Sequence, residues 1–99
     1  MARNRFEQVD EFQPDAITLS LTKDGDREAG IVIFPASASD GRIAEDRVSA
    51  KMPAIDSFRS AVRLANEMKV AVVVMDPQGV WRPEWGDLYR DEEPQDGPA

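Results

Sequence analysis

The 99-residue chain contains neither cysteine nor histidine. Without cysteine it has no disulfides, thiolate metal ligands or thiol nucleophiles, a composition typical of a reducing compartment. Without histidine it also lacks imidazole ligands and the commonest general base near neutral pH. Catalysis by carboxylates alone would need two acids converging in a cleft. We therefore expect no enzyme activity, no cofactor and no metal site.

Long apolar stretches are absent as well. No run approaches the roughly 20 apolar residues needed to span a bilayer. The opening residues 1–14 are charged where a secretory signal would need an apolar centre. These absences predict a protein that makes no membrane contact and stays in the cytoplasm.

The excess of acidic residues is unevenly distributed along the chain. The net charge of −7 divides into −2 for residues 1–15, −1 for residues 16–86 and −4 for residues 87–99. Binding to a nucleic acid backbone needs a clustered basic face, and imitation of nucleic acid needs a cluster of carboxylates in the folded part. The nearly balanced middle of the chain favours neither.

The length suits one domain with one modest core. The stretch 91–99 has two prolines and no large apolar residue, which is typical of a solvated tail. The predicted organisation has three parts: an N-terminal segment 1–14 that is partly ordered or docks on the domain, a single α+β domain 15–89, and a disordered acidic tail 90–99.

The N-terminal segment repeats an apolar residue every three positions, at Phe6, Val9 and Phe12. This spacing fits one or two helical turns, or a loose segment that docks its aromatic side chains. Both interpretations stay open, as does the question of whether the segment packs on the domain or binds a partner.

Two strands are indicated by the next segment. Ile17, Leu19 and Leu21 alternate with hydroxyl residues, which is the period of a strand with one wet face. An Asp-Gly turn follows at residues 24–25, and the β-branched run 31–34 then predicts an antiparallel hairpin. Weaker alternation over residues 47–52 suggests a third strand.

The firmest expectation is an amphipathic helix over about Asp56–Met68, whose apolar side chains occupy one half of the helical wheel. The uninterrupted apolar run 70–75 then predicts a buried strand. Pro77-Gln78-Gly79 favours a turn into a returning segment at residues 80–81, and hence a second hairpin.

The predicted fold is α+β, with a small, mostly antiparallel sheet of three to five strands in the order β-β-(β)-α-β-β. One helix packs on a single face, and the hydroxyl residues of the first strand look outward.

An acidic cluster at Asp24, Asp26 and Glu28 resembles the opening of a calcium-binding loop. With Asp24 as the first position, Ala29 stands where such a loop needs glycine and Pro35 where it needs glutamate. The comparison fails, and a solvated hairpin turn is the better account.

The most unusual local sequence surrounds two tryptophans. Trp81, Arg82, Trp85 and Tyr89 combine residue types that are enriched in interaction hot spots, and the two Trp residues are spaced to lie on the same side of the chain. These four residues are the candidate interaction surface. The structural alternative is that the aromatic side chains cover an open edge of a small core.

No motif is specific enough to attach the chain to a named family. The leading hypothesis is a small, acidic, bacterial-type accessory or protein-interaction module, with self-association as a homodimer as one use of its surface. Binding of RNA through the sheet face is an alternative that the charge and the lack of aromatics on that face disfavour. A phage- or operon-specific inhibitor that uses the acidic tail is a third. No small-molecule ligand is predicted.

Overall fold

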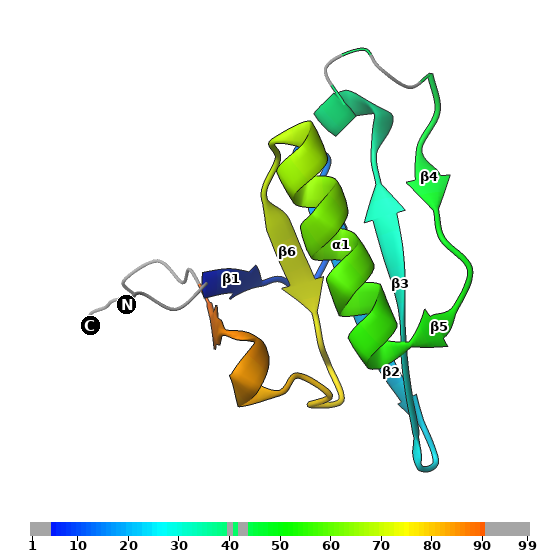
Figure 1. Cartoon of the computed structure of the whole chain (residues 1–99), viewed down its shortest axis with the longest axis vertical. Helices are drawn as coiled ribbons and strands as arrows, with labels where there is room; N and C mark the ends of the chain where they lie inside the picture. Colours follow the sequence, from blue (N-terminus) through cyan, green and yellow to red (C-terminus); the bar gives the residue numbers. More distant parts are fainter. Residues whose placement is uncertain (1–4, 40, 42–43, 91–99) are drawn as a thin grey trace.

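The computed structural model describes residues 5–39, 41 and 44–90 of the chain, and the predicted acidic tail lies outside them except for Arg90. The fold is α+β, as predicted, with one helix and one mixed sheet of seven strands (Figure 1). The elements in chain order are β1 (Arg5–Gln8), β2 (Ile17–Asp24), β3 (Arg27–Phe34), the 3-10 turn η1 (Ala36–Ser39), β4 (Arg47–Val48), β5 (Met52–Pro53), α1 (Ala54–Met68), β6 (Val72–Met75), the 3-10 turn η2 (Pro83–Trp85) and β7 (Asp87–Tyr89).

The first hairpin has the predicted form. β2 and β3 pair antiparallel from Thr18 opposite Ile33 to Asp24 opposite Arg27. The two residues between the strands begin with Gly25, whose φ of 64° lies in the left-handed region that glycine adopts without strain. The local turn signal was therefore sufficient to define this pair.

The rest of the sheet corrects the prediction of three to five mostly antiparallel strands. The order is β4-β3-β2-β6-β1-β7, with β5 also pairing with β3, and β2, β6, β1 and β7 all run parallel. The N-terminal residues 5–8 form β1 between β6 and β7 instead of a helical turn. The predicted second hairpin is also wrong, because the chain after β6 crosses the helix side of the sheet and returns as β7, parallel to β1.

Three connections join parallel strands, and all have the same hand. From β2 to β6, and from β6 to β7, the chain moves along the sheet toward β7 and crosses on the α1 side. From β1 to β2 it moves toward β4 and crosses on the opposite face. Reversing both direction and side preserves the hand, which is the right-handed one that sheet twist favours. This rule explains why segment 9–16 must cross the face opposite α1.

The predicted helix is confirmed and begins two residues earlier, at Ala54. It ends at Met68, and the next residue, Lys69, takes the left-handed conformation (φ 60°) and donates its backbone N–H to the Ala65 carbonyl at 2.7 Å. α1 contacts β2, β3, β5 and β6 on one face of the sheet (Figure 1). Burial of its small residues Ser57 and Ala61 lets the helix lie close to the strands. The apolar side of the helix therefore packs on the sheet.

The predicted third strand is divided into two short ones, β4 and β5. Between them Ser49 donates its backbone N–H to the Val32 carbonyl and accepts the Val32 N–H on its side-chain oxygen, both at 2.9 Å. A side chain thus replaces part of the regular ladder along the outer edge of β3.

The prediction that the hydroxyl residues of β2 look outward is wrong for Thr18, which is fully buried, while Ser20 and Thr22 are half-buried. Segment 9–16 crosses this face, and the Gln13 backbone N–H donates to Thr18 Oγ1 at 3.4 Å. Thr18, the first of these hydroxyl residues, therefore lies in the interior of the protein.

Within the described part of the chain, no helix has both the length and the apolar character needed to cross a membrane.

Candidate functional site

The tryptophan segment is anchored by a buried carboxylate at the end of β6. Asp76 is 6% exposed and accepts the backbone N–H of Val80 on Oδ1 at 2.7 Å and that of Trp81 on Oδ2 at 2.8 Å. The Trp81 indole N–H then donates to the Gly86 carbonyl at 3.1 Å. Asp76 thus fixes the direction in which the chain leaves the sheet.

Both tryptophans enter an aromatic cluster formed by Phe6, Phe58, Trp81 and Trp85. Trp85 stacks on Phe58 with ring centroids 4.9 Å apart and planes 10° apart. Trp81 meets Phe6, Phe58 and Trp85 edge to face at 5.2–5.4 Å. Trp85 is only 8% exposed. These contacts close the gap between α1 and β1, so the pair covers the core on this side.

The structure brings the two tryptophans together but separates them from the other two predicted site residues. Arg82 reaches the first hairpin and pairs with Glu28 at 2.7 Å. Tyr89 stands opposite Glu7 in the sheet, one position out of phase with the buried Phe6, so it faces the side away from α1. There the Arg5 guanidinium lies 4.3 Å from its ring centroid. A shared interaction surface of these four residues stays a prediction.

A different surface was missed by the sequence reasoning: the part of the sheet face opposite α1 that segment 9–16 leaves uncovered. We call it the neutral face. It consists of seven uncharged side chains from β4, β3, β2 and β6 that alternate with the core residues: Val48, Ala29, Ile31, Ile33, Ser20, Thr22 and Met75. At the hairpin end, the next pair on the same face is charged, with Asp24 opposite Arg27. Since 31% of the chain is charged, a solvent-facing sheet surface would be expected to carry charges.

The centre of the neutral face is formed by Ile31 and Ile33, both half-buried. Ile33 is opposite the 61% exposed Val48 on one side and Thr18 on the other. The sequence signal for this surface is the run 31–34, which is apolar at every position and so places apolar side chains on both sides of one strand.

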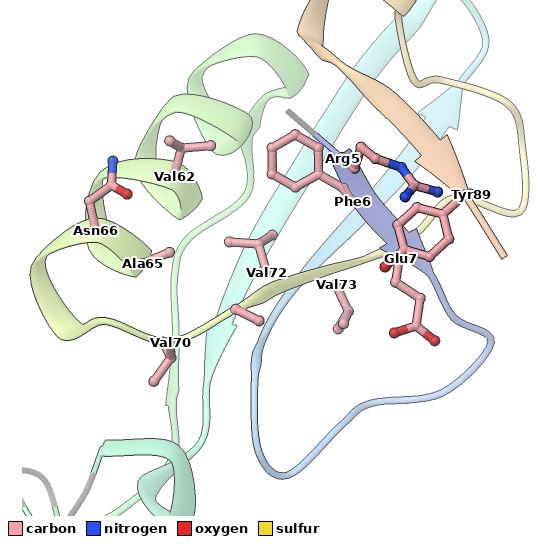
Figure 2. A pocket seen from close by; sticks show the side chains of 11 residues that line it. Arg5, Phe6, Glu7, Val62, Ala65, Asn66, Val70, Val72, Val73 and Tyr89 are labelled. Atoms are coloured by element: carbon pink, nitrogen blue, oxygen red, sulfur yellow. The ribbon is translucent and has the colours of Figure 1, made fainter. Parts of the chain in front are cut away.

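A groove of about 400 Å³ runs between α1 and the start of β1 and β6 (Figure 2). Phe6, Val62 and Val72 point into it, while Arg5 and Tyr89 lie together at its rim. The polar side chains of Glu7 and Asn66 also line it. Its one guanidinium, that of Arg5, already lies over the Tyr89 ring.

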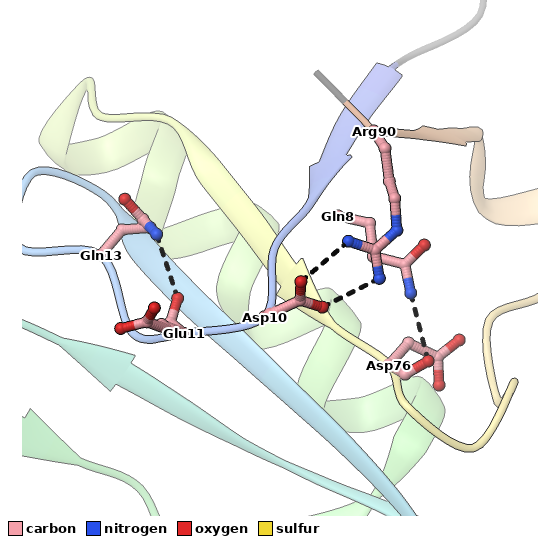
Figure 3. A network of polar contacts seen from close by, with 6 residues as sticks. All are labelled: Gln8, Asp10, Glu11, Gln13, Asp76 and Arg90. Carbon is pink, nitrogen blue, oxygen red and sulfur yellow. Dashed lines mark hydrogen bonds and ion pairs between the residues drawn. The ribbon is translucent and has the colours of Figure 1, made fainter. Parts of the chain in front are cut away.

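At the other end of the parallel strands, a polar network joins the two ends of the domain (Figure 3). Arg90 donates two hydrogen bonds to the carboxylate of Asp10, at 2.9 and 3.2 Å. The hydrogen bond to Arg90 and the charge of this guanidinium lower the pKa of Asp10. Gln8 donates its amide to the Asp76 backbone carbonyl at 3.2 Å. These hydrogen bonds link the residues at the ends of β1, β6 and β7.

Among residues 5–39, 41 and 44–90, no three acidic side chains come together in a way that could hold a metal ion. No family model matches the sequence, and no curated protein or solved structure is significantly similar to it.

Proposed function

We propose that this protein is a non-catalytic protein-interaction module and that the neutral face is its binding surface. The observation that carries the proposal is the group of seven uncharged side chains on a sheet face that neither α1 nor segment 9–16 covers. Contiguous apolar surface marks interaction sites in proteins, and Ile31, Ile33 and Val48 supply adjoining apolar side chains here. Interfaces likewise exclude charged residues from their centres.

The chemistry of the face favours a protein partner over RNA. Recognition of single-stranded RNA uses exposed aromatic side chains for stacking and basic side chains for the phosphates. The neutral face offers branched aliphatic side chains and hydroxyls. These suit dry packing against another apolar surface, with hydroxyls available for hydrogen bonds at the margin.

The surface predicted at Trp81, Arg82, Trp85 and Tyr89 is the competing location for the same function. Its weakness is that Trp85 is almost fully buried in the aromatic cluster. Its most accessible polar member, Arg82, is half-exposed, with 51% of its side chain accessible beside Glu28. One experiment can therefore compare the two surfaces.

The full chain is immobilised and used to capture proteins from the native cell, in parallel with Val48→Glu and Arg82→Gln variants. Both positions are exposed, so neither substitution should disturb the core. We expect Val48→Glu to remove specifically captured proteins and Arg82→Gln to retain them. Loss on Arg82→Gln alone would place the interaction at the tryptophan segment. Equal capture by all three baits would contradict the proposal for the neutral face.

A further inference from the structure

We infer that the two ends of the domain form one cooperative unit that opens while the rest stays folded. One segment is residues 5–10, which contain β1, and the other is residues 81–90, which contain η2 and β7. Figure 1 shows them side by side next to α1, in blue and orange. We call these two segments the terminal unit, and the elements from β2 to β6 the central unit.

Contacts between the two segments make their opening a shared event. β7 pairs with β1 along its whole length and, among the residues that the structure describes, with no other strand. The Phe6 and Trp81 rings meet edge to face at 5.3 Å. Arg90 donates two hydrogen bonds to the carboxylate of Asp10. When either segment leaves, the other loses all these contacts, so the segments should open as one.

The central unit keeps its middle strand covered without either segment. β2 lies between β3 and β6, and Leu19 on β2 is opposite Val32 on one side and Val74 on the other. Leu19 is fully buried, and α1 packs on β2, β3 and β6. These elements follow one another in the chain, so residues 5–10 and 81–90 are not needed to bring them together.

Contacts between the two units are limited in extent. β1 pairs with β6 only over Glu7–Gln8. Trp85 stacks on Phe58 of α1. The ion pair between Arg82 and Glu28 is partly exposed, and such pairs stabilise little. A short strand pair and a few side chains thus hold the terminal unit on the domain.

The two units depend on each other unequally. The hydrogen bonds between Asp10 and Arg90 join residues 80 positions apart, and closing so long a loop costs more entropy than closing a short one. Once the central unit is folded, only the short links 11–16 and 76–80 separate each segment from its place. The terminal unit therefore needs the central unit more than the central unit needs it, and it should open first.

Opening would change the surface that the domain presents. β6 would lose β1 and present unpaired backbone groups at that edge, the form in which a sheet accepts another strand. The ring of Phe58 would at the same time lose its contacts with Phe6, Trp81 and Trp85. The terminal unit thus covers one edge of the central unit in the closed form.

Native-state hydrogen exchange of the full chain, followed by NMR at increasing urea concentration, tests this opening. The Val9 N–H donates to β6 and the Trp81 N–H to the Asp76 carboxylate, so both report on the terminal unit. Leu19, paired on both sides, reports on the central unit. After correction for intrinsic rates, Val9 and Trp81 should share one opening equilibrium constant and one urea dependence. This constant should be at least about tenfold larger than that at Leu19.

Leu88→Ala and Leu64→Ala form a matched pair of variants, because each truncates a half-buried leucine that packs against the core. Leu88 belongs to β7 and Leu64 to α1. Leu88→Ala should accelerate exchange at Val9 and Trp81 alike by at least about fivefold, since lost packing in the terminal unit favours its opening. Leu64→Ala should accelerate exchange at Leu19 and leave Val9 and Trp81 unchanged, because Leu64 stays packed when the terminal unit opens.

Three results would overturn the inference. One is a single equilibrium constant and urea dependence at Val9, Trp81 and Leu19, which would mean that the domain unfolds as a whole. Another is a different opening constant at Val9 and at Trp81. The third is Leu64→Ala accelerating both of these amides as much as Leu88→Ala does. Circular dichroism checks that the variants fold, and the unmodified chain by itself decides the first two results.

Discussion

Gly30 of β3 lies directly beneath Ser57 of α1, so closely that a Cβ added at position 30 would overlap the Ser57 hydroxyl and come within 2.9 Å of its Cβ. The contact joins the helix to the antiparallel edge of the sheet. Ser57 is fully buried and donates its hydroxyl to the Ala54 carbonyl at 2.7 Å.

Gly30→Ala is therefore expected to lower the free energy of unfolding by about 1–3 kcal/mol through overpacking. Urea denaturation measures the loss. In a Ser57→Ala background the clash with the hydroxyl is gone, so the cost of Gly30→Ala should be smaller there. Strictly additive effects in this double-mutant cycle would show that the two residues do not limit each other.

Stacking of Trp85 on Phe58 should appear as an energetic coupling. Leucine substitutions at both positions, made singly and together, are expected to give a coupling free energy of about 0.5–1.5 kcal/mol, because stacked rings stabilise beyond the area they bury. Thermal or urea unfolding provides the values. The control cycle pairs Phe58→Leu with Tyr89→Leu, a ring on the opposite side of the sheet, and should show no coupling.

The carboxylate of Asp76 holds two backbone N–H groups in a buried setting. In Asp76→Asn one of the two oxygens is replaced by an NH₂ group that cannot accept either N–H. The expected loss is about 1.5–3 kcal/mol in the free energy of unfolding, the range for hydrogen bonds to a charged group. Amide hydrogen exchange should accelerate at Val80 and Trp81 first. Asp24→Asn, at an exposed turn carboxylate, is the control and should change stability by less than about 0.5 kcal/mol.

The Asp10–Arg90 pair predicts a pH dependence at the acidic end of the scale. The guanidinium lowers the pKa of Asp10 in the folded state, so the pair stabilises the fold above the carboxyl's unfolded pKa, and the effect is lost as the pH falls through the folded pKa. Both groups are largely exposed, and salt should reduce the effect.

An NMR titration of the Asp10 carboxyl carbon measures this directly. Arg90→Gln should move the pKa of Asp10 upward toward its ordinary value, because the positive charge is removed. Arg82→Gln, which changes a guanidinium on the other side of the sheet, should leave the titration of Asp10 as it was. An unchanged Asp10 titration in Arg90→Gln would show that the pair does not persist in solution.

Sequence reasoning was most successful for elements whose conformation is determined by residues close together in the chain. The alternation from Ile17 to Leu21 and the Asp-Gly turn define the β2–β3 hairpin within a few residues. The apolar half of the helical wheel defines α1. In each case the physical cause, a period of 2 or 3.6 or a turn residue, is present in a short stretch of chain.

The candidate site was harder to predict, because burial is a property of the whole fold. The spacing of Trp81 and Trp85 predicted that they lie on the same side of the chain, and their rings are in contact. It did not reveal that Phe6, about 75 residues earlier, completes their cluster. The sequence also did not predict that the Ile31–Ile33 side of β3 is exposed, because this depends on where segment 9–16 crosses the sheet.

The sequence by itself thus determined the composition limits, the hairpin, the helix and the strand that follows it. The tertiary structure decided that residues 5–8 enter the sheet between β6 and β7, that four strands run parallel, and that part of the face opposite α1 is left open. The reason is physical. Long-range packing and the right-handed crossover determine which strands pair in a parallel sheet. Residues 5–8 contain a single large apolar side chain, so their local sequence does not predict which strands they pair with.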